Sequence, residues 1–165
     1  MLPWLLPFPW FGQGNHHGQQ QYNDNQFNHS EIQIMDLTSI ELAGSVIASV
    51  TSQGGEVVIR FEPAYLIKTM TGSDERTKWK QNVELVFTGA SLEDPGQLAF
   101  PVTCAGGDVG ENIYTYRDMI PVPLDSRGSA HCDLGLVDAE QRIRVQGESL
   151  QLVQEGVPKY MEHIR

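Results

Sequence analysis

The sequence is poor in basic residues. It has 11 lysine and arginine residues against 21 aspartate and glutamate residues, a formal net charge of −10, and no basic residue precedes Arg60. Proteins that bind nucleic acid neutralise phosphates with clustered lysine and arginine, and proteins that dock on anionic lipid use the same residues. The composition therefore argues against both as partners. It favours attraction to a basic protein surface.

Cysteines and long apolar runs are also scarce. Cys104 and Cys132 are the two cysteines of the 165-residue chain, too few for a disulfide framework, although a single bridge in an exported protein stays open. No run of about 18 apolar residues occurs, so no membrane-spanning helix is expected. The segment MLPWLLPFPWFG lacks the basic start and the small-residue cleavage site of a secretion signal. We therefore predict a cytoplasmic protein.

Motifs for metals, cofactors and catalysis are missing. His131 and Cys132, with the distant Cys104, form the one His/Cys grouping, and it lacks the short spacings that zinc sites use. Neighbouring residues on a strand point to opposite faces, so a nucleophile pair would require Cys104 to approach His131 in space. The glycine-rich stretch 105–111 matches neither common phosphate-binding pattern, and no G-x-S-x-G motif occurs. We predict no metal and no cofactor, and the sequence favours a protein that is not an enzyme.

The clearest structural signal is the stretch 40–68, which reads as two β-strands joined by a turn at residues 52–55. Apolar residues alternate with other residues on both sides of this turn, as in strands with one buried face. β-Branched side chains dominate both arms, and Gly54 and Gly55 can adopt the positive φ angles of a hairpin turn. Pro63 cannot donate a ladder hydrogen bond, which predicts a bend or a sheet edge there.

Further short strands follow at intervals typical of all-β proteins. Cys132 is expected to face the core and His131 the solvent. Turn signals lie at 69–76, 94–96, 106–107, 125–128 and 138–140. Strands are predicted at 32–35, 79–88, 98–103, 113–122, 130–136, 142–147, 150–153 and 159–164. With no helical period, the pattern predicts a single antiparallel β-sandwich or small barrel of about eight strands over residues 31–165.

A smaller pattern, apolar-x-apolar-x-Gly, ends at Gly44, Gly89 and Gly147. Glycine inside or just after a strand often marks a bulge or a bend. We hypothesise that these three glycines are corners of a curved sheet. Regular, extended backbone angles at these glycines would contradict this hypothesis.

Residues 1–30 differ from the rest of the chain. Residues 13–30, QGNHHGQQQYNDNQFNHS, are too polar to bury a core and are predicted to form a flexible linker. Residues 1–12 contain three prolines, which favour an extended or polyproline-like course. Exposed aromatic side chains cost solubility and are frequent at binding hot spots. An undocked tail and a strip folded back on its own domain are the alternatives to a docking role, for which the candidate side chains are Trp4, Phe8, Trp10 and Phe11.

Two functions remain open on this basis. The first is a non-enzymatic, acidic all-β protein-interaction or assembly module that uses the N-terminal aromatic arm on a protein partner or on copies of itself. The second is a small enzyme or ligand-binding domain with a site in the loops 89–111 and 124–129, because sites commonly lie on loops of a rigid sheet. A deep pocket with convergent carboxylates or His131 would favour the second function.

Overall fold

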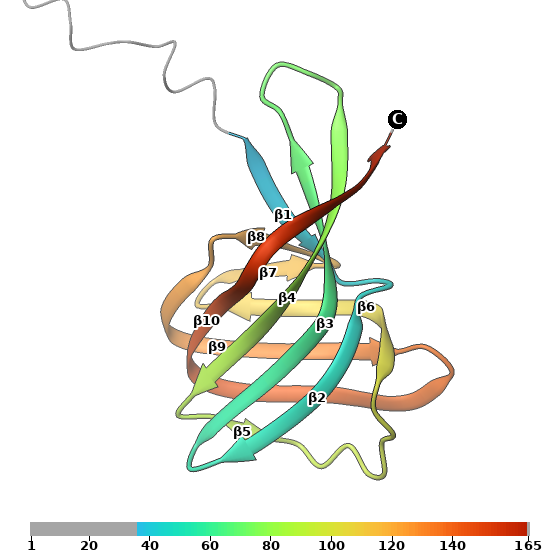
Figure 1. Ribbon diagram of the computed structural model, residues 1–165. Coiled ribbons are helices and arrows are strands. Elements are labelled where there is room, and N and C mark those ends of the chain that lie inside the picture. The colour runs from blue at the N-terminus through green and yellow to red at the C-terminus, as the bar shows by residue number, and fades with distance from the viewer. Residues whose placement is uncertain (1–35, 165) are drawn as a thin grey trace, which may run out of the picture.

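The computed structural model describes residues 36–164, and this part of the chain is all-β (Figure 1). The predicted all-β fold is confirmed, and no helix is present in the described residues. The predicted strand 32–35 and the arm residues 1–30 lie outside the described range. The strands are β1 (Leu37–Glu41), β2 (Val46–Gln53), β3 (Glu56–Thr69), β4 (Arg76–Thr88), β5 (Ser91–Leu92), β6 (Val102–Glu111), β7 (Tyr114–Arg117), β8 (Met119–Val122), β9 (Asp125–Leu136) and β10 (Ala139–Ile164).

Six strands close into a barrel. They are hydrogen-bonded in the order β2-β6-β9-β10-β4-β3, and β3 pairs with β2 to complete the ring. Every pairing is antiparallel. The closing contact between β2 and β6 is short and joins Val46 to Thr103 and Ile47 to Val102. A closed ring leaves few unpaired strand edges in the barrel wall.

The barrel interior is filled by the alternating apolar residues of its strands. Val57, Ile59 and Phe61 of β3 are buried and pair across the ladder with buried residues of β4. The predicted inward position of Cys132 is confirmed, since it is buried with Leu134 beside it. Because apolar side chains point inward at every second position, the core forms without a second layer.

A second sheet projects from one end of the barrel (Figure 1). It is formed by β8, β1, residues 64–69 of β3, residues 76–81 of β4 and residues 159–164 of β10, in the order β8-β1-β3-β4-β10. We call it the projecting sheet. Its strands continue from the barrel through register shifts, one of which contains Pro63, as the bend prediction required.

The predicted hairpin is confirmed as β2 and β3, and Gly54 (φ 62°) and Gly55 (φ 78°) form its turn. The corner hypothesis agrees with the backbone. Gly44 (φ 89°) separates β1 from β2, and Gly89 (φ 54°) follows β4. Gly147 lies at a register shift of β10.

Several predicted boundaries are wrong. The three strands predicted at 142–147, 150–153 and 159–164 are one strand, β10, which continues through register shifts between Glu155 and Lys159 and between Tyr160 and Glu162. The strand predicted at 113–122 is divided into β7 and β8 by Asp118, whose φ is 62°.

The predicted loops are also partly strand. The strand predicted at 98–103 begins only at Val102, and the turn predicted at Gly106–Gly107 lies inside β6. The turn predicted at 125–128 is the beginning of β9. Glycines that would break most local structures remain paired here, because the ladder between β6 and β9 runs through Gly106 and Gly107.

Candidate functional site

The projecting sheet gathers the lysines of an acidic protein. Its strands carry the acidic residues Glu41 and Glu162, and the loop between β3 and β4 adds Asp74 and Glu75, so this region is nearly balanced in charge, whereas most other acidic residues lie around the barrel. All four lysines of the chain and one arginine are on this sheet, namely Lys68, Arg76, Lys78, Lys80 and Lys159.

Four side chains from three strands form an aromatic cluster on this sheet: Lys68 of β3, Trp79 of β4, and Tyr160 and His163 of β10. The Trp79 and Tyr160 rings meet edge to face with centroids 5.4 Å apart, and Tyr160 meets His163 at 5.8 Å. Lys68 Nζ lies 4.2 Å from the centroid of the Trp79 ring. The ladder explains this arrangement, because Trp79 is the direct partner of Tyr160, and directly opposite side chains share a face.

Hydrogen bonds fix the cluster in orientation. The Trp79 indole Nε1 donates to Thr77 Oγ1 at 2.8 Å, and the Tyr160 hydroxyl lies 3.0 Å from His163 Nδ1. Tyr160 remains 52% exposed although it touches two rings. The cluster is therefore an ordered aromatic surface open to solvent. Tryptophan and tyrosine are the residues most enriched at binding hot spots.

Exposed apolar side chains are concentrated in the same region. Six of the eleven exposed large hydrophobic residues in the described chain lie on the projecting sheet, its hairpin tip or its junction with the barrel. The strand register places Leu37 and Met119 on the face opposite the aromatic cluster, so the exposed apolar residues are spread over both faces of the sheet. The six are Leu37, Met70, Met119, Val157, Tyr160 and Met161.

Proline is present in one outer strand of the projecting sheet and directly before the other. Pro121 lies in β8, and Pro158 lies in the register shift of β10 just before residue 159. Proline cannot donate a ladder hydrogen bond, and such edges resist the addition of another strand. A partner is therefore expected to contact side chains on a face of this sheet.

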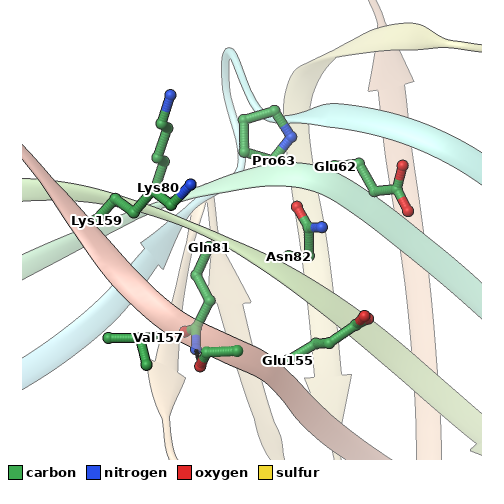
Figure 2. Close-up of a pocket in the computed structure, with 9 residues that line it drawn as sticks. Glu62, Pro63, Lys80, Gln81, Asn82, Glu155, Val157 and Lys159 are labelled. Carbon is green, nitrogen blue, oxygen red and sulfur yellow. Dashed lines mark hydrogen bonds between the residues drawn. The ribbon is translucent and has the colours of Figure 1, made fainter.

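A pocket of about 540 Å³ lies where the projecting sheet meets the barrel (Figure 2). Lys80 and Lys159 line one end of it and are direct ladder partners. Neither lysine makes an ion pair within residues 36–164. Glu62 and Glu155 line the other end. The pocket is therefore polar, with opposite charges at its two ends.

The pocket is supported by one buried amide and one arginine. The Gln81 side chain donates to the Gly156 carbonyl at 2.8 Å and accepts a hydrogen bond from Gln154 at 2.9 Å. Arg60 contacts Glu62, Glu84 and Glu155, and these carboxylates raise its pKa. Because both pocket glutamates are bound to the same arginine, they are not free to act as an acid/base pair.

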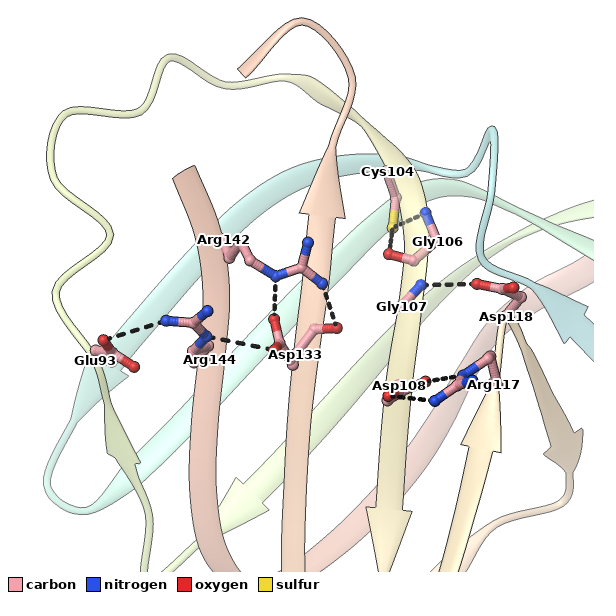
Figure 3. A network of polar contacts seen from close by, with 10 residues as sticks. All are labelled: Glu93, Cys104, Gly106, Gly107, Asp108, Arg117, Asp118, Asp133, Arg142 and Arg144. Atoms are coloured by element: carbon pink, nitrogen blue, oxygen red, sulfur yellow. Dashed lines mark hydrogen bonds and ion pairs between the residues drawn. The ribbon is translucent and has the colours of Figure 1, made fainter. Parts of the chain in front are cut away.

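The alternative site in the loops is only partly present. Residues 102–111 and 125–129 belong to strands, and a hollow of about 450 Å³ on the barrel wall contains Glu93, His131, Asp133 and Arg144. Both carboxylates of this hollow are bound to arginine (Figure 3), with Asp133 Oδ1 2.5 Å from Arg142 Nε and Glu93 3.5 Å from Arg144.

The charges around Asp133 determine its titration. Burial works to raise the pKa of this carboxyl, but the hydrogen bonds and positive charges of Arg142 and Arg144 outweigh it and hold the pKa below its usual value. Within residues 36–164 no three His, Cys, Asp or Glu side chains gather in a way that could hold a metal ion. The carboxylate of Asp133, which lies beside His131, is thus already bound by the two arginines.

The two cysteines are free thiols inside the barrel wall. Burial raises the pKa of Cys104, and burial raises the pKa of Cys132 to about 12. A thiol is a nucleophile in its thiolate form. At neutral pH the structure therefore gives neither cysteine the character of a catalytic group.

The structure does not test the site predicted from the sequence. Trp4, Phe8, Trp10 and Phe11 lie outside the described residues. The aromatic cluster was missed because it depends on the register between β4 and β10, which brings residues 79 and 160 together. The available signal was the predicted strand that begins with Trp79, in line with the core residues Val83, Leu85 and Phe87, together with Tyr160 near the end of the sequence.

Comparison of the chain with protein-family models, with curated proteins and with solved structures gave no match. No helix of the described residues has the length and apolar character needed to cross a membrane.

Proposed function

We propose that the protein is a non-enzymatic interaction or assembly module, in which the N-terminal aromatic arm docks on a protein surface. The partner is a further copy of the chain. The arm supplies proline and aromatic residues, and the barrel supplies a rigid body that carries the projecting sheet.

The observation that supports this proposal is the aromatic cluster of the projecting sheet. It combines an ordered Trp79–Tyr160 pair with further exposed apolar residues on the same sheet and with an outer strand, β8, that contains proline. A surface of this composition costs solubility unless it is covered. The wall hollow, by contrast, has its carboxylates bound by arginines, which gives a ligand-binding or enzymatic function less support.

The test keeps the full chain and changes only the arm. In the arm variant, Trp4, Phe8, Trp10 and Phe11 are all replaced by serine. The molar mass in solution is measured over a range of concentrations by sedimentation equilibrium. We expect the unmodified chain to self-associate and the arm variant to sediment as a monomer.

A control variant replaces Gln13, Gln19, Gln20 and Gln21 of the linker with serine, which changes as many residues without removing aromatic side chains. It is expected to associate as the unmodified chain does. Equal masses for the unmodified chain and the arm variant at every concentration would reject the proposed function.

A further inference from the structure

We propose that the pocket where the projecting sheet meets the barrel binds a short peptide by its two free termini. The peptide carboxylate contacts Lys80 and Lys159, and the peptide ammonium contacts the glutamates at the other end of the pocket (Figure 2). This site goes beyond the proposed function, because it is built from residues of the barrel and the projecting sheet and does not involve the arm.

Two irregularities in the strands form the hollow. β3 has a register shift between Phe61 and Ala64, and β10 has one between Glu155 and Lys159. Both lie beside residues 81–82 of β4, which pairs with β3 on one side and with β10 on the other. Most of the residues inside the two shifts line the pocket. Bulges are frequent next to binding sites, where they end the pairing locally and redirect side chains.

The positive end of the pocket has no counter-charge in the described chain. Lys80 and Lys159 are direct ladder partners, so their side chains lie on the same face of the sheet. Like charges at directly opposite positions destabilise a sheet, and neither lysine makes an ion pair within residues 36–164. The other two lysines of the sheet do have partners, an aromatic ring and a carboxylate. A carboxylate bound between Lys80 and Lys159 would remove their repulsion.

The opposite end of the pocket remains negative. Glu62 and Glu155 share Arg60 with Glu84, so one guanidinium serves three carboxylates and cannot neutralise them. The side chains of Glu62 and Glu155 are 43% and 57% exposed, which leaves them open to a ligand. A carboxylate has about four acceptor positions, so each glutamate can accept from an ammonium while it contacts Arg60.

The separation of the two ends selects the length of the ligand. Along β4, Lys80 lies two positions from Asn82, which pairs with Glu155. It lies four positions from Glu84, the ladder partner of Arg60. At about 3.3 Å per residue, the charged ends are about 7–13 Å apart. A single amino acid is too short to join them, whereas an extended tripeptide spans about 10 Å.

A side-chain amide in the middle of the pocket suits a peptide. Asn82 lies between the lysine end and the glutamate end (Figure 2), and its side chain makes no hydrogen bond within residues 36–164. An amide offers both donors and an acceptor, which a peptide group complements. The pocket volume of about 540 Å³ lies in the range usual for sites that bind small ligands.

The test measures the binding of triglycine to the full chain, followed by changes in the backbone amide signals of its NMR spectrum. Two derivatives are the ligand controls, since N-acetyl-triglycine lacks the ammonium and triglycine amide lacks the carboxylate. We expect triglycine to shift the signals around Gln81 and Gly156. Each derivative is expected to bind about tenfold or more weakly, the usual effect of losing a hydrogen bond between charged groups.

A pair of double variants tests the lysines. The pocket variant combines Lys80→Gln with Lys159→Gln. The control variant combines Lys68→Gln with Lys78→Gln, which removes the same charge from the same sheet outside the pocket. We expect triglycine to bind the pocket variant about tenfold or more weakly and the control variant unchanged. Unfolding in urea shows that both variants are folded.

Three results would overturn the inference. The first is the absence of any shift around Gln81 and Gly156, and the second is equal weakening by the two double variants, which would assign the effect to the charge of the whole sheet. The third is undiminished binding of N-acetyl-triglycine, which would show a site for anions alone. The arm variant is expected to bind triglycine as the unmodified chain does, so this inference and the proposed function can fail separately.

Discussion

The His131 ring on β9 occupies the space beside Gly110 on β6, where any other residue would place a Cβ atom. The two residues are direct ladder partners, and a Cβ built on Gly110 would collide with the imidazole. Gly110→Ala is therefore expected to destabilise the protein by about 1–3 kcal/mol, the usual cost of inserting a methyl group into filled space. The measurement is the free energy of unfolding in urea.

Removal of the ring provides the control for this prediction. Gly110→Ala in a His131→Ala background should cost much less, with a coupling energy of about 1 kcal/mol or more in the double-mutant cycle. Additive effects of the two changes would show that the ring moves aside without cost.

A second glycine of β6 faces backbone instead of a side chain. A Cβ on Gly107 would collide with the Asp133 carbonyl oxygen and lie 2.9 Å from Leu134 Cα, and the φ of Gly107 is 151°. Backbone of a paired strand cannot yield as a side chain can, so Gly107→Ala is expected to destabilise by about 3 kcal/mol or more. The melting temperature and the denaturant midpoint measure this.

Gly96 is the matched position for this comparison. It also has a positive φ, 77°, but no atom lies within 4 Å of its added Cβ. Gly96→Ala should cost only the backbone strain of about 1–2 kcal/mol. If the two variants were equally stable, close approach to β9 would not be the reason for glycine at position 107.

The fold could be predicted wherever the sequence signals of a short segment agree with the strand pairing in the structure. Alternation from Val57 to Phe61 and the Gly54–Gly55 turn required no knowledge of distant residues, and both are present. The single strand β10 was not predictable, because Gly147 and Pro158 interrupt the pattern locally, while β9 and β4 keep the chain extended through them. Gly106 and Gly107 were mispredicted for the same reason. Their sequence indicates a turn, but pairing with β9 holds them in a strand.

The candidate interaction surface could likewise be predicted only in part from the sequence. The apolar, proline-rich arm is visible in the sequence, since its composition alone makes Trp4 and Trp10 unusual. The aromatic cluster is not visible, because Trp79 and Tyr160 are 81 positions apart and meet only after β4 and β10 pair in one register. The composition of a short segment can be read from its sequence, but its pairing with a strand far away in the sequence cannot.

The carboxyl of Asp133 predicts an acid-dependent contribution to stability. Its pKa is lowered in the folded protein by Arg142 and Arg144, from the ordinary value of 3.8. Such a group stabilises the fold above its unfolded pKa and loses that effect as the pH falls through its folded pKa. Asp133→Asn should therefore be less stable than the unmodified protein at pH 6, and the difference should shrink at pH values below 3.8.

The measurement is the free energy of unfolding of both proteins from pH 6 down to pH 2. The side chain of Asp133 is 39% exposed, so solvent screening keeps the expected difference small, on the order of 1 kcal/mol. Asp138→Asn is a suitable control, because Asp138 makes no ion pair within residues 36–164. A difference for Asp133→Asn that stays constant through the acid range would contradict the role assigned to the two arginines.

Cys132 predicts the opposite pH dependence at alkaline pH. Burial raises its pKa to about 12 from the ordinary value of 9.0, so the unfolded chain ionises this thiol before the folded protein does. Stability from this group is complete below pH 9.0 and is lost as the pH rises toward 12. Cys132→Ala removes the titrating group. The unmodified protein should therefore lose stability relative to Cys132→Ala as the pH rises from 8 to 11.

A second variant, Cys132→Ser, separates the effect of burying a polar group from the effect of ionising the thiol. It has nearly the shape of the native residue, but it places a hydroxyl at a position that is only 3% exposed and lined by the barrel core. The backbone of Val145 offers one hydrogen bond at this position. The rest of the hydrogen-bonding capacity of a buried hydroxyl would be unmet, at a cost of about 1–3 kcal/mol, so at pH 7 Cys132→Ser should be less stable than Cys132→Ala. Unfolding in urea ranks the three proteins. If serine proved the more stable replacement, the hydrogen bond with Val145 would outweigh the burial of the hydroxyl, and the description of Cys132 as an apolar core residue would be wrong.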